Sequence, residues 1–139
     1  MMKKCRLIFV DTSAHFAIAN KKDPDHEKAN GFLKKLAKER YTLLITNFIL
    51  SETYTLMLRK IGREKAIEYI ENLKKSSMIV RVSAEDEKKA WEIICQYKDK
   101  DFSYVDATSF VVMERLGAKK TFAFDDHFKQ YGFVKVPNL

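Results

Sequence analysis

Five short apolar runs, most of them rich in β-branched residues, alternate along this chain with longer stretches of helical periodicity. Each run has the length and composition of a β-strand. An alternation of strands and helices predicts an α/β fold. Its right-handed crossovers would place helices on both faces of a central parallel sheet of four to five strands, a three-layer α/β/α arrangement. The runs are RLIFV (6–10), TLLIT (42–46), MIVRV (78–82), KTFAF (120–124) and a weaker FVKV (133–136).

The intervening stretches carry apolar residues at helical spacing, together with signals for helix ends. Thr12 is a candidate N-cap, Pro24 suits the start of a helix, and Ser83 with Glu87 resembles a capping box. Gly62 separates two neighbouring helices, and Gly117 ends a later one. The expected helices span 12–20, 24–39, 47–60, 63–75, 84–97, 103–116 and a short 125–131.

The length of 139 residues suits one domain, which we expect to span 1–139, because no repeat or Pro/Gly-rich linker divides the chain. The 26 Lys and Arg residues exceed the 19 Asp and Glu residues, which gives a net charge of +7. This surplus favours a polyanionic partner, such as nucleic acid or an anionic membrane. A basic, solvated surface without a special partner explains the charge about equally well.

The two cysteines, Cys5 and Cys95, have no spacing typical of a zinc site, and two free thiols suit the reducing cytoplasm. The apolar run near the N-terminus, from Leu7 to Val10, is too short for a signal peptide or a membrane span. We therefore expect a cytoplasmic protein without a membrane segment.

Four acidic residues lie at places where a carboxylate is unexpected. Asp11 ends the first predicted strand, and Asp125 ends the fourth. Ligand sites in parallel sheets lie beyond the carboxyl ends of the strands, so both acids should lie at that edge. Glu52 and Asp106 lie on, or beside, the apolar faces of two predicted helices, where an unpaired carboxylate costs several kcal/mol.

Each acid also has an ordinary structural explanation. Asp11 could cap a helix, Glu52 could pair with a buried basic residue, and Asp106 could be favoured by a helix dipole. Asp125 or Asp126 could cap the last helix. Taken together, the four acids favour a site in which Mg²⁺ or Mn²⁺ relieves the repulsion between converging carboxylates.

Other chemistry has weaker support in the sequence. His15, His26 and His127 lack metal-binding spacing, and we expect His15 to have a packing or surface role. No serine lies in a Gly-x-Ser-x-Gly elbow, and neither a Gly-x-Gly-x-x-Gly motif nor a P-loop is present. An aspartyl-phosphate phosphatase would usually carry a second Asp two residues after Asp11, where this chain has Ser13.

Four stretches of the sequence together resemble the PIN domain family of metal-dependent ribonucleases, and within it the VapC-type toxins. FVDTSA resembles the opening strand with the first acid, and ITNFILSET resembles the second strand with the helix that carries a glutamate. FSYVDATSFVVMERLG resembles the third acidic motif. TFAFDDHFKQYGF resembles the closing motif, in which an Asp precedes a Phe by three residues.

The resemblance implies that Asp11, Glu52, Asp106 and Asp125 bind one or two Mg²⁺ or Mn²⁺ ions and are the catalytic residues. The spacing to Phe128 favours Asp125 over its neighbour as the fourth acid. The resemblance further implies a PIN-like fold, RNA as substrate, a protein antitoxin as partner and a homodimer. Residues with supporting roles would be Thr12, Ser13, Ser109 and Asp126.

The function we predict is hydrolysis of RNA phosphodiester bonds by the toxin of a toxin–antitoxin pair. Basic residues around the site would bind the RNA backbone without reading its sequence. Two alternatives stay open. The chain could be a PIN-like nuclease of RNA processing or of DNA, without a toxin role, or it could be a non-catalytic RNA-binding module.

Overall fold

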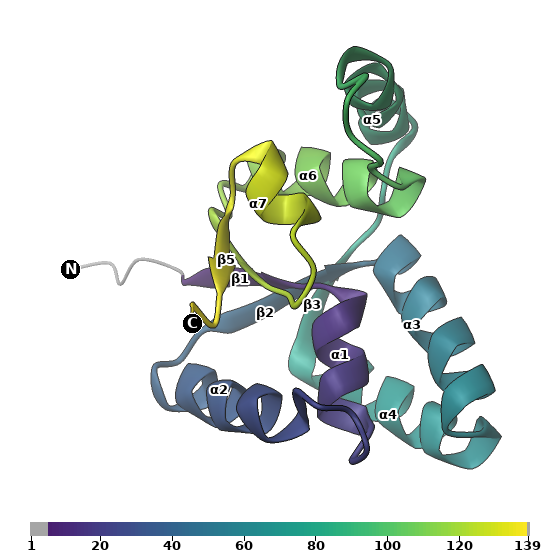
Figure 1. Ribbon diagram of the computed structural model, residues 1–139, viewed down its shortest axis with the longest axis vertical. Coiled ribbons are helices and arrows are strands. Elements are labelled where there is room, and N and C mark those ends of the chain that lie inside the picture. The colour runs from purple at the N-terminus through teal and green to yellow at the C-terminus, as the bar shows by residue number, and fades with distance from the viewer. Residues whose placement is uncertain (1–5, 139) are drawn as a thin grey trace.

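A five-stranded sheet, in which all strands are parallel, is the frame of the molecule (Figure 1). The computed structural model describes residues 6–138. The strand order is β3-β2-β1-β4-β5, so β1 lies at the centre of the sheet. The predicted parallel sheet of four to five strands is confirmed. The strands are β1 (Leu7–Val10), β2 (Thr42–Thr46), β3 (Ser77–Val80), β4 (Lys120–Phe122) and β5 (Val134–Val136).

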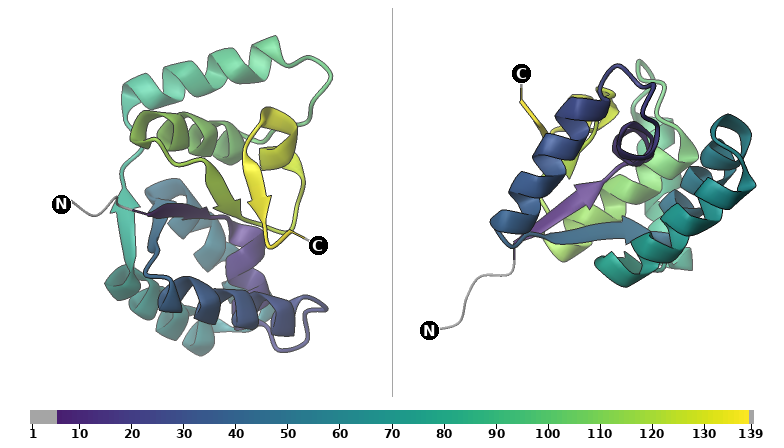
Figure 2. Two further views of the ribbon diagram at one scale, coloured as in Figure 1. Left: turned by 90° about the vertical axis from the view of Figure 1, so that its left-hand side faces the viewer. Right: turned by 90° about the horizontal axis from the view of Figure 1, so that it is seen from below.

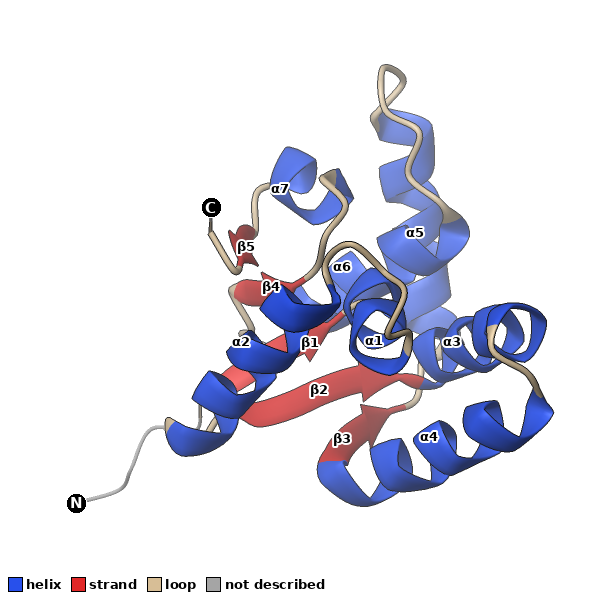
Figure 3. Cartoon of the chain, turned by 60° about the horizontal axis from the view of Figure 1, so that its bottom comes forward, coloured by secondary structure: helices blue, strands red, loops and turns tan. Residues whose placement is uncertain are grey.

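Helices cover both faces of this sheet. Figures 1 and 2 show α1, α2 and α4 on one face and α6 and α7 on the other, with α5 packed on the outer side of α6. Figure 3 shows α3 beyond the carboxyl end of β2. The helices are α1 (Thr12–Ala19), α2 (His26–Lys38), α3 (Asn47–Lys60), α4 (Arg63–Ser76), α5 (Ala84–Gln96), α6 (Tyr104–Leu116) and α7 (His127–Tyr131).

The strand order reverses direction at the centre of the sheet. From β1 the chain continues to β2 and β3 on one side, whereas β4 and β5 are added on the other side of β1. The carboxyl ends of β1 and β4 therefore flank a topological switch point, where open α/β sheets form their ligand sites. Asp11 follows β1 directly, and its backbone N–H continues the ladder by donating to the carbonyl of Phe122 at 3.0 Å.

Several predicted helix ends are correct, and others are wrong by one or two residues. Asp11, and not Thr12, is the N-cap of α1, because its carboxylate accepts the N–H of Ser13. The second helix begins at His26, after a turn around Pro24 in which the His26 N–H donates to the carbonyl of Asp23. The remaining strand and helix bounds differ from the predicted ones by at most two residues.

The capping box of α5 pairs Ser83 with Asp86 rather than with Glu87. The same motif begins α6, where Ser103 is the N-cap and Asp106 is its reciprocal partner. In each pair the serine hydroxyl accepts the N–H of the acid, and the carboxylate accepts the N–H of the serine. Such a cap contributes about 1 kcal/mol to stability.

Helix α6 lies in the interior of the molecule, because the sheet covers one of its sides and α5 covers another. The side chains from Asp106 to Met113 are all buried. A helix that is buried all round has no polar face. Gly117, with a φ of 75°, ends this helix in the left-handed conformation that glycine adopts without strain.

Candidate active site

All four predicted acids line one pocket of about 690 Å³ at the carboxyl edge of the sheet. We call it the acid pocket. The loops that follow β1 and β4 bring Asp11 and Asp125 to it, α3 brings Glu52, and α6 brings Asp106. Four segments far apart in sequence therefore place carboxylates on the same cavity, as the strand-end rule predicts.

Asp11 is the most buried of the four acids. It is 3% exposed, and its Oδ2 accepts hydrogen bonds from the backbone N–H of Ser13 at 3.2 Å and from the Ser13 hydroxyl at 2.7 Å. Burial, followed by the charge of Asp125 and a shared hydrogen bond with it, raises the pKa of Asp11 well above its usual value. The two carboxyl groups are thus close enough to repel each other when both are ionised.

The structure places Asp125 and Asp126 in different surroundings. Asp125 lines the acid pocket, and its Oδ1 accepts the backbone N–H of His127 at 3.1 Å. Asp126 is exposed, and its carboxylate accepts a hydrogen bond of 2.7 Å from Lys135, which lowers its pKa. The geometry thus brings Asp125, and not Asp126, to the other three acids.

Asp106 is held from two sides. Its Oδ2 accepts the backbone N–H of Ser103 at 3.1 Å, and the ring of His127 lies 2.6 Å away through Nδ1. An ionised carboxylate accepts but does not donate, so Nδ1 carries the proton in this pair. The ring of Phe102 packs edge-on against the imidazole, with 6.0 Å between the centroids.

Glu52 lies at the mouth of the acid pocket. Its side chain is exposed, whereas the sequence predicted a place on, or beside, an apolar helix face. Within residues 6–138, no basic residue forms an ion pair with it. Partial burial of its carboxyl group raises the pKa of Glu52, and the charges of Asp106 and Asp125 raise it further. A hydrogen bond with Thr12 acts in the opposite direction. The charges of Asp106 and Asp125 therefore act on the carboxyl group of Glu52.

The residues predicted to support the acids divide into two groups. Thr12 and Ser13 line the acid pocket, and the Thr12 hydroxyl also lies 3.2 Å from that of Thr53. Ser109 does not line that pocket; it is buried one turn after Asp106 in α6, its hydroxyl donates to the Val105 carbonyl at 2.7 Å, and its supporting role stays a prediction.

His15 has the packing role that we expected. It is buried, its Nδ1 lies 2.8 Å from the hydroxyl of Tyr69, and it does not line the acid pocket. Burial lowers the pKa of His15 to about 3, so the ring is neutral at physiological pH. Of the two cysteines, Cys95 is exposed and Cys5 lies outside the described residues.

Two ionisable residues of the acid pocket, Arg59 and His127, were not predicted from the sequence. Arg59 follows Glu52 by seven residues, which is two helical turns along the same face of α3, so this spacing could have revealed it. His127 was sought as a metal ligand, by its spacing from other histidines. Its actual partner is a carboxylate 21 positions away, and that distance in sequence gave no signal.

The acids suit a divalent cation that keeps part of its water shell. Within residues 6–138, no three Asp, Glu, His or Cys side chains already stand in an arrangement that could hold a metal ion. Mg²⁺ usually binds proteins through one or two carboxylates, several waters and substrate phosphates, which does not require a closed ring of ligands. Burial and then the charge of Asp125 raise the pKa of Asp11, and a bound cation would offset both effects.

None of the helices within residues 6–138 is long and apolar enough to cross a membrane.

Comparison with known proteins places these features in a family. The PIN domain family model matches residues 8–134. The 23S rRNA-specific endonuclease VapC20 of Mycobacterium tuberculosis is 36% identical over 132 residues, which cover 94% of this chain and 98% of that protein. A VapC ribonuclease of Archaeoglobus fulgidus is 31% identical over 123 residues, covering 86% of this chain and 77% of that protein.

The fold agrees with solved structures of such proteins. The crystal structure of M. tuberculosis VapC20, described as a toxin that cleaves the sarcin–ricin loop, superimposes with a TM-score of 0.81 at 35% identity. That match covers 91% of this chain and 96% of the other. A VapBC2 structure from Rickettsia felis, at 16% identity and a TM-score of 0.72 over 93% and 96% of the two chains, shares the fold. The family model and the relatives each span most of the chain, and the chain therefore belongs to the PIN domain family, among its VapC-type members.

Proposed function

We propose that this chain is a divalent-metal-dependent endoribonuclease and the toxin of a toxin–antitoxin pair. The observation that carries the proposal is the meeting of Asp11, Glu52, Asp106 and Asp125 in one pocket at the switch point of the sheet. Two relatives also support the proposal. One is a 23S rRNA-specific endonuclease and the other is a VapC ribonuclease.

Each acid has a role that follows from its surroundings. Asp11 and Asp125 are close together and would share one cation, because neither has a basic partner among residues 6–138. Asp106, held by Ser103 and His127, would present its other oxygen to the same cation or to a bound water. When bound, the cation lowers the pKa of a water molecule and offsets charge on the phosphate.

The protein itself would orient the substrate. Glu52, at the mouth of the acid pocket, is placed to hold the attacking water by accepting one of its protons in a hydrogen bond. Arg59 lies on the same wall of the pocket and would contact a phosphate oxygen of the RNA. A reaction of this kind needs no side-chain nucleophile, since water attacks phosphorus and the leaving oxygen takes up a proton.

The relatives suggest which substrate and which partner to test first for this chain. VapC20 acts on 23S rRNA, and its structure is described as that of a sarcin–ricin loop-cleaving toxin. We propose ribosomal RNA as the first substrate to test here. We further propose a protein antitoxin as partner, a homodimer as the assembly and the cytoplasm as the compartment, all of which agree with a VapC-type role. A single domain over residues 1–139 stays a prediction.

Asp125 and Asp126 provide a matched pair of variants for the test. With purified ribosomes and total RNA as substrates, the wild-type chain should cleave in Mn²⁺ or Mg²⁺ and lose activity in EDTA. Asp125→Asn and Asp106→Asn should lower cleavage about 100-fold or more, because each removes a charge from the acid pocket. Asp126→Asn should remain within about threefold of wild type, because its side chain faces Lys135.

A fully active Asp106→Asn protein would contradict the assignment of the acid pocket. Growth arrest on expression, relieved by a neighbouring antitoxin gene, would separate a toxin from a PIN nuclease of RNA processing. A folded wild-type chain that binds RNA but cuts none of the substrates in either metal would favour the non-catalytic module.

A further inference from the structure

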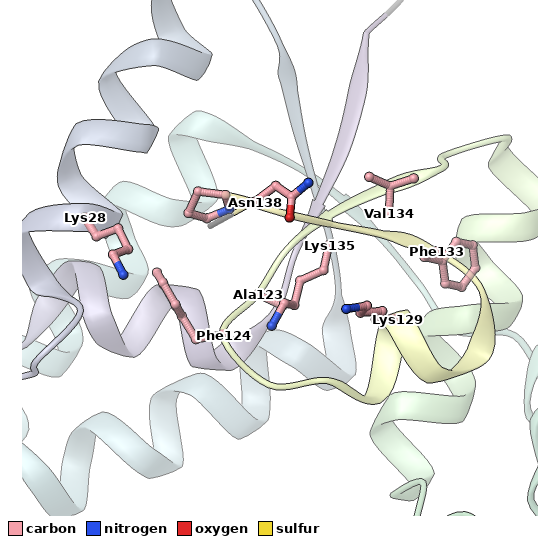
Figure 4. Close-up of a pocket in the computed structure, with 9 residues that line it drawn as sticks. Lys28, Ala123, Phe124, Lys129, Phe133, Val134, Lys135 and Asn138 are labelled. Carbon is pink, nitrogen blue, oxygen red and sulfur yellow. The ribbon is translucent and has the colours of Figure 1, made fainter.

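A second pocket of about 330 Å³ lies beside the acid pocket and is lined by lysines. We call it the lysine pocket. Lys28 reaches it from α2, Lys129 from α7 and Lys135 from β5, and the half-buried ring of Phe124 forms part of its wall (Figure 4). In Figure 4 the amino groups of Lys129 and Lys135 point into the space beside Ala123. We propose that this pocket is a subsite for a phosphate of the RNA backbone, an inference that rests on the proposed nuclease function.

The two pockets share the short loop between β4 and α7 as a common wall. Ala123 and Phe124 line the lysine pocket, and Asp125 lines the acid pocket. Ser13 joins the two sides, because its hydroxyl accepts the N–H of Phe124 at 3.0 Å and donates to Asp11 at 2.7 Å. A strand of RNA held at the acids would pass over this loop and meet the lysines next.

The charges in the lysine pocket are unbalanced. Lys135 is paired with Asp126 at 2.7 Å, whereas neither Lys28 nor Lys129 takes part in an ion pair within residues 6–138. Three lysines and one aspartate leave a local charge of +2. Three separate elements bring these like charges to one cavity, and a bound anion would offset their repulsion.

The chemistry of the pocket fits a phosphodiester rather than a base edge. Lysines bind phosphate as point charges and carry no sequence information, so they would hold the RNA strand without selecting its bases. The ring of Phe124 offers an apolar face on which a base of any identity can stack. The lysine pocket would thus strengthen RNA binding and position the strand, while cleavage takes place at the acids.

The test measures RNA binding in the Asp106→Asn background, so that the probe stays intact. The probe is a fluorescein-labelled single-stranded RNA of 12 nucleotides and mixed sequence, followed by fluorescence anisotropy across a salt series. Each lost phosphate contact reduces the slope of log Kobs against log salt by about 0.7 for single strands. The Lys28→Gln/Lys129→Gln variant should therefore lower that slope by about 1.4.

The matched control is Lys88→Gln/Lys89→Gln, which removes the same charge from exposed positions on α5. This control should keep the wild-type slope. In the catalytically competent chain, the Lys28/Lys129 variant should raise KM for RNA about tenfold and leave kcat within about twofold, as expected when binding is lost equally from ground and transition states. All four lysines are exposed, so both variants should melt at the wild-type temperature.

The outcomes separate the subsite from the nuclease function. If the wild type cleaves RNA and the two double variants agree in slope and KM, the subsite is overturned and the nuclease function stands. If RNA is bound with the predicted lysine dependence but not cut, the subsite survives without the function. A loss of affinity for fluorescein-labelled oligoglutamate, with RNA binding unchanged, would make the lysine pocket a docking site for an acidic protein segment and would also overturn the proposal.

Discussion

Asp106 shows how one residue can serve both the fold and the site. Its N–H and its carboxylate form the capping box with Ser103, which fixes the start of α6. The hydrogen bonds from Ser103 and His127 both go to Oδ2, and within the described residues none goes to Oδ1. The oxygen that the fold does not use is therefore the one available to a ligand. Asp106→Asn should therefore disturb the start of α6 less than Asp106→Ala, because the amide oxygen can still accept the Ser103 N–H.

His127 should act as a positioning residue for two of the acids. Its N–H binds Asp125, and its ring binds Asp106. His127→Ala keeps the first bond and loses the second, so we expect cleavage to fall about tenfold, in the range typical of residues that orient ligands. His127→Asn can place an amide N–H near the position of Nδ1 and should recover most of the activity.

The positioning role predicts more than a lower rate. The Mn²⁺ concentration that gives half-maximal cleavage should rise in His127→Ala and return towards wild type in His127→Asn, with melting temperatures nearly equal. A loss of activity at an unchanged Mn²⁺ requirement would show that the imidazole acts on the RNA instead of on Asp106.

At the residue scale, the sequence pointed to the four acids that the structure brings to one pocket, but not to the residues around them. Asp11 and Asp125 followed from their places at strand ends, and the resemblance to a known family favoured Asp125 over Asp126. The contact between His127 and Asp106 depends on how α6 and α7 pack, which no local pattern encodes. The supporting role of Ser109 stays a prediction, and its hydroxyl donates to the Val105 carbonyl of the preceding turn.

At the scale of elements, α5 depends on α6 for its position. The two helices pack through a small cluster of Ala90, Ala107 and Val111, and Arg115 of α6 clamps the buried Asp86 of α5 with bonds of 3.1 and 2.8 Å. Asp86 also closes the capping box that starts α5. One carboxylate thus links the start of one helix to the end of another.

Arg115→Met should destabilise the chain by about 1–3 kcal/mol at pH 7, because it leaves a buried carboxylate without its cation. Burial alone would raise the pKa of Asp86, but the hydrogen bonds from Arg115 and Ser83 outweigh it, and the net shift is downward. A pKa that is lower in the folded state stabilises the fold above the unfolded pKa, near 3.9, and this contribution is lost as pH falls through the folded value.

Urea unfolding at pH 7 and at pH 3 would measure both effects. The difference between wild type and Arg115→Met should be largest at pH 7 and smaller at pH 3, because pH 3 lies below the unfolded pKa and part of the stabilisation from the Asp86 charge is lost there. A difference of equal size at both pH values would mean that Arg115 stabilises α5 and α6 by packing rather than by its charge.

Sequence analysis predicted the elements themselves better than their ends. Within residues 6–138, apolar runs placed the five strands, because strands covered on both faces are continuously apolar, and helical periodicity placed the seven helices. The errors lie in turns. The Asp23 carbonyl and carboxylate both accept N–H groups around Pro24, which delays the start of α2 to His26. Asp86 outcompetes Glu87 for the cap, because it is the third residue of the helix.

At the scale of the whole molecule, the fold collects negative charge at one edge of the sheet although the chain as a whole carries +7. A bound Mn²⁺ should therefore stabilise the folded state. At a concentration of 100 times its Kd, a ligand that binds only the folded chain adds about 2.7 kcal/mol, which corresponds to a rise in melting temperature of about 5–10 °C for a chain of this size.

Asp11→Asn is the informative variant for this effect. The amide can still cap α1, and it removes a buried charge that faces Asp125, so the variant in EDTA should melt at least as high as the wild type. Its melting temperature should then change little on addition of Mn²⁺. A wild-type chain whose melting temperature does not respond to Mn²⁺ or Mg²⁺ would argue against a resident cation.

The strand order also determines when the chain becomes a nuclease. Asp11 and Asp125 are 114 positions apart in sequence, and they meet once β4 has paired with the open side of β1. A folding intermediate that contains β1, β2 and β3 would hold Asp11 and Glu52 but neither of the other acids. Pairing across so long a loop is slow compared with the formation of single helices. In a refolding experiment, activity should therefore return after most of the helical signal, and partly folded molecules would be harmless to the cell that makes them.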